Sequence, residues 1–116
     1  QDTTIEMGCM SFLPGSHKLM DVRDIHTSDQ EGWKKEIPDL QWWPRMVIPL
    51  RVGDCTFHHG MTFHAAGANL SEQWRVAHVV IFVDANATYN GQGHIVTDPL
   101  DLPVGILPPD DICPPV

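Results

Sequence analysis

The nine residues from Arg75 to Val83, RVAHVVIFV, restrict the fold more than any other stretch of the chain. They are rich in β-branched and aromatic side chains, which favours a β-strand. Alternate residues of a strand point to opposite faces, and here both sets of positions are mainly apolar. We therefore predict a strand that is covered on both sides, within a sheet that other parts of the protein must bury.

Three shorter segments also have the composition of strands. Cys9–Leu13 is largely apolar and ends at a Pro-Gly-Ser sequence, which is typical of a turn. Met46–Leu50 is the second, and Pro49 places it at a sheet edge or marks the end of its pairing. After a Gly-Asp turn, Cys55–His59 is the third. Short strands separated by glycine and proline turns predict an all-β sandwich or barrel.

Two regions fall outside this predicted sheet. After the first strand the chain becomes polar, and Thr27 or Ser28 could cap a short helix that ends by Lys35, although a loop insertion fits the same residues. Residues 99–116 contain six of the ten prolines, which cannot donate backbone hydrogen bonds to a sheet. We expect one domain over residues 1–98 and an extended proline-rich tail over residues 99–116.

Charge and composition exclude several classes of partner. The 116 residues carry 7 basic and 15 acidic side chains, a net charge of −8, and the largest basic cluster is the pair Lys34-Lys35. This argues against nucleic acid and anionic membranes. No apolar run approaches the roughly 20 residues that cross a bilayer, and the first residues lack a secretory leader pattern. Cys9, Cys55 and Cys113 fit neither a disulfide framework nor a zinc motif. We expect a soluble, cytoplasmic protein with reduced thiols.

The segment FHHGMTFHAAGANLSEQWR, residues 57–75, concentrates the residues that could carry chemistry. His64 stands eleven residues before Arg75, so that in a double-stranded β-helix both could point into the barrel mouth. Imidazole is a good ligand for iron(II), and a guanidinium group can hold a carboxylate through two hydrogen bonds. The spacing alone leaves open that His64 is an ordinary strand histidine and that Arg75 pairs with Glu72 or Asp54.

Several longer matches make the pattern more specific. The histidine, asparagine, serine and arginine form the pattern H-x4-N-x-S-x3-R. Over about residues 1–84 the chain resembles the phytanoyl-CoA dioxygenase family, the iron(II)- and 2-oxoglutarate-dependent oxygenases of the jelly-roll class. The fold that this resemblance implies is all-β, a partial double-stranded β-helix (jelly roll, cupin-like) that lacks its early strands. The matching sequences are FLPGSHK at 12–18, GD at 53 and 54, FHHGMTFHAAGAN at 57–69 and N-x-S-x3-R at 69–75.

The resemblance implies roles for individual residues. His64 would be the distal histidine ligand of iron, and Arg75 would bind the C5 carboxylate of 2-oxoglutarate. Asn69 and Ser71 would line the pocket or hold the loop between those two residues. His58 falls at a position often occupied by histidine in such sequences, where it would support the metal site from outside the ligand set.

The remaining histidines are harder to assign. His59 has the opposite parity to its neighbour in the predicted strand, so we interpret it as structural or solvent-facing. His17 follows the Pro-Gly-Ser turn. The resemblance implies a position near the pocket mouth, and a turn histidine without a catalytic role fits the sequence equally well. His26, His78 and His94 belong to no pattern.

The chain departs from the family at the metal. Iron in these enzymes is held by two histidines and one carboxylate, the first two ligands coming from an H-x-D/E motif. None of the seven histidines is followed two residues later by Asp or Glu. In the family this motif precedes the segment that matches Gln1–Gly8, so we interpret the chain as a C-terminal fragment. It would carry one iron ligand of three and be inactive by itself, without stoichiometric iron.

The parent protein is thus predicted to hydroxylate a small organic substrate while 2-oxoglutarate is converted to succinate and carbon dioxide. An alternative is a non-catalytic, cupin-like β-sandwich that binds a metal or anion through His58, His59 and His64. A third is an interaction module whose contact surface is the proline-rich tail. A jelly roll without its early strands would expose strand edges, so we also expect a homodimer.

Overall fold

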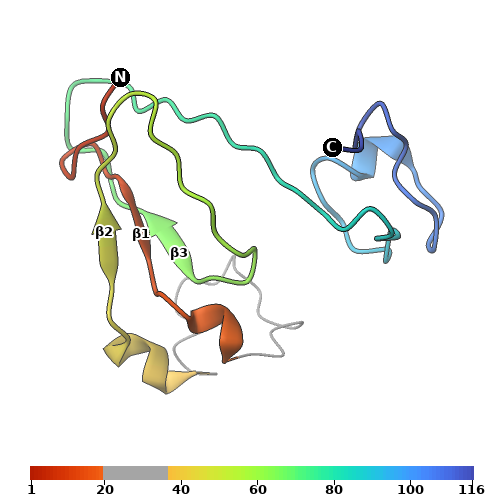
Figure 1. Ribbon diagram of the computed structural model, residues 1–116, viewed down its shortest axis with the longest axis horizontal. Coiled ribbons are helices and arrows are strands. Elements are labelled where there is room, and N and C mark those ends of the chain that lie inside the picture. The colour runs from red at the N-terminus through yellow and green to blue at the C-terminus, as the bar shows by residue number, and fades with distance from the viewer. Residues whose placement is uncertain (20–36) are drawn as a thin grey trace. The chain divides into compact units, whose positions relative to one another are not determined.

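The computed structural model describes residues 1–19 and 37–116 (Figure 1). These residues form two compact units, Gln1–Ala77 and His78–Val116. Their regular elements are short β-strands and 3-10 helices, with no α-helix in the described ranges. None of the helices in those ranges has the length and apolar character needed to cross a membrane. The predicted helix that begins at Thr27 or Ser28 lies outside the described residues.

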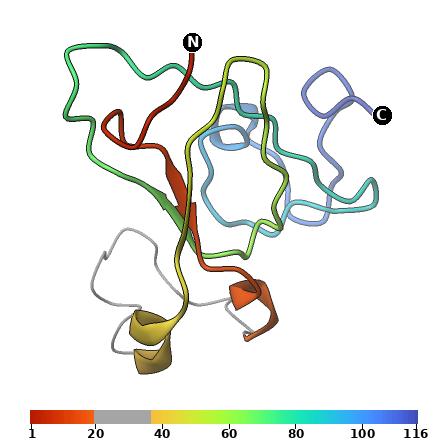
Figure 2. The same cartoon turned by 60° about the vertical axis from the view of Figure 1, so that its left-hand side comes forward.

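Three short strands form an antiparallel sheet in the first unit. They are β1 (Met10–Phe12), β2 (Met46–Ile48) and β3 (His64–Ala66), in the order β2-β1-β3 (Figures 1 and 2). The strands predicted around β1 and β2 are therefore confirmed, and β2 ends before Pro49 at an edge of the sheet. The register pairs Phe12 with His64, which fixes the position of that histidine beside the central strand.

The chain leaves β1 through a tight turn into a short helix. Gly15 has φ 80, a conformation that glycine adopts without steric cost. The helix η1 (Ser16–Lys18) follows it, and the buried hydroxyl oxygen of Ser16 accepts a hydrogen bond from the Phe63 amide at 2.9 Å. A second contact, from the Trp43 indole nitrogen to the Pro14 carbonyl oxygen at 2.7 Å, holds the end of helix η2 (Pro38–Trp42) against the same turn.

The described residues of the first unit form a small buried core. Its apolar members surround the start and end of β1, and the buried polar side chains beside them are those of Ser16 and Thr62. A core of this size contributes only a modest hydrophobic stabilisation, so backbone contacts between distant segments matter more here than in a large domain. The buried apolar residues are Met7, Cys9, Phe12, Leu13 and Leu40.

One of these backbone contacts brings Gly8 against Gly67. Gly8 has φ 72, and a Cβ atom built there would lie 2.2 Å from the Gly67 carbonyl oxygen. Beside it, the Leu70 amide donates to the Glu6 carbonyl oxygen at 2.9 Å. The loop after β3 is therefore packed directly on the backbone that precedes β1.

Gly8→Ala should destabilise the first unit strongly. An L-residue with left-handed φ costs about 1–2 kcal/mol, and the new Cβ must also displace the Gly67 carbonyl, so we expect a loss of about 2 kcal/mol or more in the free energy of unfolding. Urea denaturation measures it. Gly53→Ala is the matched control, because Gly53 has φ 91 but no heavy atom within 4 Å of the added Cβ. Equal losses in the two variants would contradict the close packing at Gly67.

Two predicted strands are absent from the described structure. Residues 55–59 belong to a long excursion without strand structure between β2 and β3. Among the described residues, residues 75–83 have no strand structure and no backbone–backbone hydrogen bonds. Val76, Val79 and Ile81 are more than two-thirds exposed, so the expected cover on both faces is absent as well. Strand composition is a local property, whereas a strand persists only when a neighbour pairs with it.

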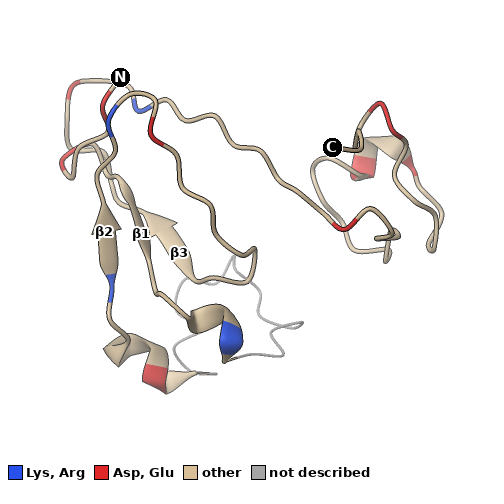
Figure 3. Cartoon of the chain, viewed as in Figure 1, with Lys and Arg blue, Asp and Glu red and all other residues tan. Residues whose placement is uncertain are grey.

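The second unit consists of turns and one short helix, η3 (Asp98–Leu100). The Tyr89 amide donates to the Ile106 carbonyl oxygen, and the Gly105 amide donates to the Tyr89 carbonyl oxygen, both at 2.8 Å. This unit contains five aspartates and no lysine or arginine (Figure 3). The domain boundary predicted after residue 98 stays a prediction.

Candidate functional site

Two histidine rings gather over a buried phenylalanine at one end of the sheet. The ring centroids of His58 and His64 are 4.6 Å apart, and those of Phe12 and His58 are 4.9 Å apart. The rings of Phe12 and His64 are stacked at 6.0 Å. Pairing of β3 with β1 places His64 here, whereas His58 arrives from the excursion between β2 and β3.

A backbone contact sets the tautomer of His64. Its Nδ1 lies 2.7 Å from the Thr62 carbonyl oxygen. Because a carbonyl oxygen can only accept, Nδ1 carries the proton in this contact. In the neutral ring the lone pair is then on Nε2. Histidines that bind metals usually donate the other ring N–H in this way, so the contact of His64 has the geometry expected of an imidazole that binds a metal through Nε2.

The environment of His58 disfavours its charged form. The side chain is exposed overall, but its ring faces Phe12 and His64. Partial burial and, next, the electrostatic influence of His64 lower the pKa of His58 below the ordinary value of 6.5. The structure therefore favours a neutral imidazole beside His64.

This pKa shift predicts how stability depends on pH. The unfolded chain takes up a proton at His58 at a higher pH than the folded chain does. The contribution of neutral His58 to the free energy of unfolding is therefore complete above about pH 6.5. It is lost as the pH falls through the lowered pKa that His58 has in the folded chain. Thermal unfolding between roughly pH 5 and pH 8 measures it. His58→Phe should flatten the profile and the exposed-histidine control His78→Phe should not; an unchanged profile in His58→Phe would contradict the assignment.

Arg75 is half-buried and lies against the segment before β1. Its Nη1 donates a hydrogen bond to the Gly8 carbonyl oxygen. His64 pairs with Phe12 on the same segment, so the two anchor points are at most about 13 Å apart along an extended backbone. The structure thus attaches both predicted site residues to one stretch of chain, at its opposite ends. The described residues offer no further hydrogen-bond partner to the guanidinium, so its other N–H groups can bind an anion.

Asn69 and Ser71 organise the loop between these two residues. The Asn69 side-chain oxygen accepts hydrogen bonds from the Ser71 amide at 3.0 Å and from the Ser71 hydroxyl at 2.7 Å. The Asn69 amide group donates to the Gln73 carbonyl oxygen at 2.7 Å. This is an Asx-type turn, which reverses the chain within a few residues. These contacts hold the loop; they do not make either side chain a ligand.

An open cavity of about 440 Å³ lies beside the histidine cluster. His58 lines it, and so do His17 and His59, whose rings stack with centroids 5.2 Å apart. The expectation that His58 and His59 point to opposite faces is wrong, because the residues around them do not form a strand. The cavity is further lined by Phe12, Pro14, Gly15, Met46, Ile48, Thr56, Phe57 and Thr62.

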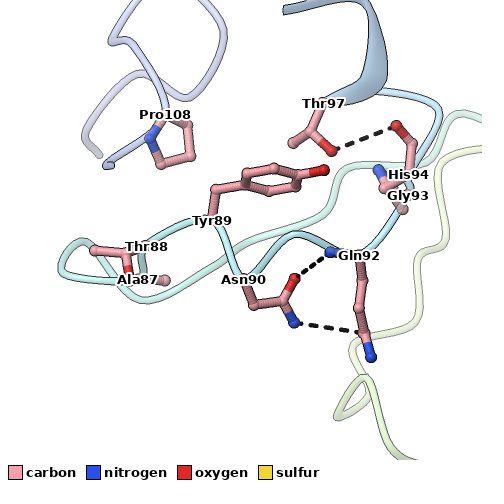
Figure 4. A pocket seen from close by; sticks show the side chains of 9 residues that line it. All are labelled: Ala87, Thr88, Tyr89, Asn90, Gln92, Gly93, His94, Thr97 and Pro108. Atoms are coloured by element: carbon pink, nitrogen blue, oxygen red, sulfur yellow. Dashed lines mark hydrogen bonds between the residues drawn. The ribbon is translucent and has the colours of Figure 1, made fainter. Parts of the chain in front are cut away.

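The second unit has a cavity of its own, of about 310 Å³ (Figure 4). Tyr89 and Pro108 line it, and the Thr97 hydroxyl donates to the His94 carbonyl oxygen at 3.4 Å. Asn90 and Gln92 hydrogen-bond to each other. None of the residues that line this cavity is an aspartate, glutamate, lysine, arginine or cysteine, so we assign it no chemical role.

The described residues fit a metal only in part. In residues 1–19 and 37–116, no three His, Cys, Asp or Glu side chains come together closely enough to hold a metal ion. His64, with its tautomer fixed by Thr62, suits the role of a single imidazole ligand. Sequence reasoning missed the Thr62 carbonyl and the ring of Phe12, because neither contact has a signature in the residue pattern.

Comparison with known proteins identifies the family. Residues 1–77 match the family model described as phytanoyl-CoA dioxygenase (PhyH). The chain is 30% identical over 95 residues to the Caenorhabditis briggsae phytanoyl-CoA dioxygenase domain-containing protein 1 homolog, covering 75% of this chain and 33% of that protein. It is 29% identical over 108 residues to the Mus musculus phytanoyl-CoA dioxygenase domain-containing protein 1, covering 89% of this chain and 37% of that protein. The chain thus spans about a third of the length of these relatives.

Solved structures agree with this assignment. The chain is similar to the non-heme alpha ketoglutarate dependent carbocyclase SnoK from nogalamycin biosynthesis, with 36% identity and a TM-score of 0.81 over 97% of this chain and 45% of SnoK. It is also similar to the epimerase SnoN in complex with Fe3+, alpha ketoglutarate and nogalamycin RO, with 45% identity and a TM-score of 0.51 over 62% of this chain and 27% of SnoN. The family match covers well over half of the residues, and the chain therefore belongs to the phytanoyl-CoA dioxygenase family.

Proposed function

We propose that this chain supplies the C-terminal part of an iron(II)- and 2-oxoglutarate-dependent oxygenase with a double-stranded β-helix fold. His64 would be one iron ligand, and Arg75 would hold the C5 carboxylate of 2-oxoglutarate. The observation that carries the proposal is the contact between His64 Nδ1 and the Thr62 carbonyl, which leaves Nε2 free to bind a metal in a member of this family. The named cofactors of similar solved proteins, alpha ketoglutarate in SnoK and Fe3+ with alpha ketoglutarate in SnoN, support it.

The residues of the chain would bind and orient the reactants. Iron and 2-oxoglutarate, when bound, would supply the redox chemistry: dioxygen is the oxidant, and 2-oxoglutarate provides two electrons as it takes up one oxygen atom and is converted to succinate and carbon dioxide. Arg75 would fix the far end of 2-oxoglutarate, because a guanidinium group matches the geometry of a carboxylate. Asn69 and Ser71 would keep the loop between His64 and Arg75 in one conformation. The reaction that we propose is hydroxylation of a small organic substrate; SnoK and SnoN are named as a carbocyclase and an epimerase.

The remaining iron ligands would come from a longer protein. No H-x-D or H-x-E sequence is present in these 116 residues, and the relatives are about three times as long as the matched segments. The test is therefore made with a longer family protein in which such a motif precedes the segment equivalent to Gln1–Val116. Iron-loaded protein should convert 2-oxoglutarate to succinate in the presence of oxygen. An iron-loaded, folded protein that leaves 2-oxoglutarate intact with every substrate offered would contradict the proposal.

An alternative function draws on one specific observation. The rings of His58 and His64 lie 4.6 Å apart, so two imidazoles could take up a metal without oxygen chemistry. His59 would not belong to that site, because its ring stacks on His17 instead. Zinc or nickel bound in place of iron, with no consumption of 2-oxoglutarate by the longer protein, would favour this alternative.

We also propose that the chain self-associates, as a homodimer. Among the described strands, β2 and β3 each have one edge without a neighbour, and exposed strand edges are sites of pairing between chains. The extended segment after Arg75 adds a contiguous set of exposed apolar side chains, which soluble proteins rarely leave uncovered. Its members are Val76, Val79, Val80, Ile81, Phe82 and Val83.

Light scattering at micromolar concentration should therefore report a dimer. Ile81→Lys should shift the equilibrium toward the monomer, because a charge in this apolar segment must be desolvated on association. Ile95→Lys is the matched control, since Ile95 is also highly exposed but lies outside the segment. A compact monomer in the unmodified chain would contradict self-association.

A further inference from the structure

The stacked pair His17 and His59 has hydrogen-bonding capacity that the described structure does not use. The two rings face each other at 5.2 Å with an interplanar angle of 27°, and both line the 440 Å³ cavity. His17 Nδ1 is buried and has no hydrogen-bond partner among the described residues. A buried polar atom without a partner is unfavourable, so this nitrogen needs a partner that the described residues do not supply.

The contacts of His59 define which groups the pair offers. Its Nδ1 accepts a hydrogen bond from the Met61 amide at 3.1 Å. The neutral ring therefore carries its proton on Nε2, and His59 offers a donor. His17 can present the lone pair of the buried Nδ1, which is an acceptor. The rings stack with centroids 5.2 Å apart and both line one cavity, so the donor of His59 and the acceptor of His17 belong to the same small region of it.

We propose that His17 and His59 bind the hydroxyl group of an uncharged, mainly apolar small molecule. A hydroxyl donates to one partner and accepts from another, so it satisfies both rings, whereas a ketone or an ether can only accept. The rest of the cavity agrees with this chemistry. Its large side chains include Phe12, Ile48 and Phe57, and the described residues that line it include no lysine or arginine, so they offer no cation to a carboxylate or phosphate.

The position of the pair makes this molecule the substrate of the proposed oxygenase, and to that extent the inference rests on the proposed function. His58 lines the same cavity, and its ring lies 4.6 Å from that of His64. A molecule held at its hydroxyl by His17 and His59 therefore extends along the cavity toward the proposed iron ligand. The pair would select a substrate that already bears a hydroxyl group and fix which carbon is presented for reaction.

The test measures binding of three six-membered-ring probes to the full 116-residue chain by NMR of the histidine rings at pH 8. Cyclohexanol can donate and accept, cyclohexanone can only accept, and cyclohexanecarboxylate is an anion. We expect cyclohexanol to shift the His17 and His59 ring signals and to bind about fivefold more tightly than cyclohexanone, the ratio for one net hydrogen bond. Equal binding of alcohol and ketone, or preference for the carboxylate, overturns the proposal.

Variants separate hydrogen bonding from ring packing. His17→Phe keeps an aromatic ring against His59 and should weaken cyclohexanol binding about fivefold. His17→Asn, whose amide reaches the position of Nδ1, should retain most of the affinity, and His78→Phe should leave it unchanged. Retained affinity in a folded His17→Phe protein overturns the proposal. If His17→Phe fails to fold, the proposal is tested by two other results: the cyclohexanol affinity of His17→Asn and the comparison of cyclohexanol with cyclohexanone on the unmodified chain.

The outcome is independent of the proposed oxygenase chemistry, because the probes require neither iron nor 2-oxoglutarate. Loss of cyclohexanol binding in His17→Phe, together with a longer protein that fails to bind 2-oxoglutarate, supports the hydroxyl site and contradicts the proposed function. Normal 2-oxoglutarate binding by the longer protein, together with equal binding of cyclohexanol and cyclohexanone, supports the proposed function and contradicts the hydroxyl site.

Discussion

Arg75→Ala should weaken 2-oxoglutarate binding to the longer, iron-loaded protein by roughly 2 to 5 kcal/mol, the range for removing one partner of a buried charge pair. The guanidinium is half-buried, and one N–H is used by the Gly8 carbonyl, so the others can hold a carboxylate. Arg75→Lys keeps the charge but loses the planar pair of donors. Its affinity for 2-oxoglutarate should fall between those of the unmodified protein and Arg75→Ala. Isothermal titration under anaerobic conditions measures the affinities.

A matched control removes another arginine. The side chain of Arg51 is exposed, and Arg51→Ala should leave the affinity for 2-oxoglutarate unchanged. Because Arg75 also contacts Gly8, the unfolding free energy of Arg75→Ala should be measured alongside the affinity. Unaltered affinity for 2-oxoglutarate in a folded Arg75→Ala protein would mean that the arginine only anchors the chain to Gly8.

His64→Ala should remove iron from the longer protein and abolish conversion of 2-oxoglutarate. Residues that merely orient a ligand alter metal affinity by 10-fold to 100-fold, so loss of a ligand itself should exceed about 100-fold. The substitution also removes the hydrogen bond to the Thr62 carbonyl and the ring contact with Phe12, so the free energy of unfolding should fall by about 1 kcal/mol, which leaves the protein folded. Metal analysis after dialysis measures the loss.

Two other substitutions make the His64 result specific. His78→Ala removes an exposed histidine from the segment after Arg75 and should leave iron content unchanged. His58→Phe keeps an aromatic ring between Phe12 and His64 and should lower iron content far less than His64→Ala does. An equal loss of iron in His58→Phe would make His58 a ligand and would contradict the assignment of His64 as the one ligand from this chain.

The parts of the fold that the sequence predicted are those with local signals. β1 and β2 were predicted because short apolar runs end at a Pro-Gly-Ser turn and at Pro49. β3 has the sequence His-Ala-Ala, without β-branched residues, and it forms only because it pairs with β1. Residues 75–83 show the reverse case, a strong strand sequence without a neighbour among the described residues. Pairing between distant segments is a tertiary property that composition does not contain.

The same distinction applies to the site. The H-x4-N-x-S-x3-R pattern predicted His64, Asn69, Ser71 and Arg75, and it led to the family to which the chain belongs. The stacking of His59 on His17 could not be predicted from the sequence, because alternation of side chains applies only within a strand and the described residues around His59 do not form one.

The central claim is that this chain holds one ligand of an iron site whose other ligands lie in a longer protein. Iron content, measured on the chain alone and on a longer family protein with the H-x-D/E motif, tests it most directly. One imidazole cannot hold iron(II) against water, because ferrous sites gain affinity from several ligands fixed together. We predict no stoichiometric iron in the 116-residue chain and one iron per molecule in the longer protein. Tight iron(II) binding by the 116 residues alone, lost on His64→Ala, would contradict this account.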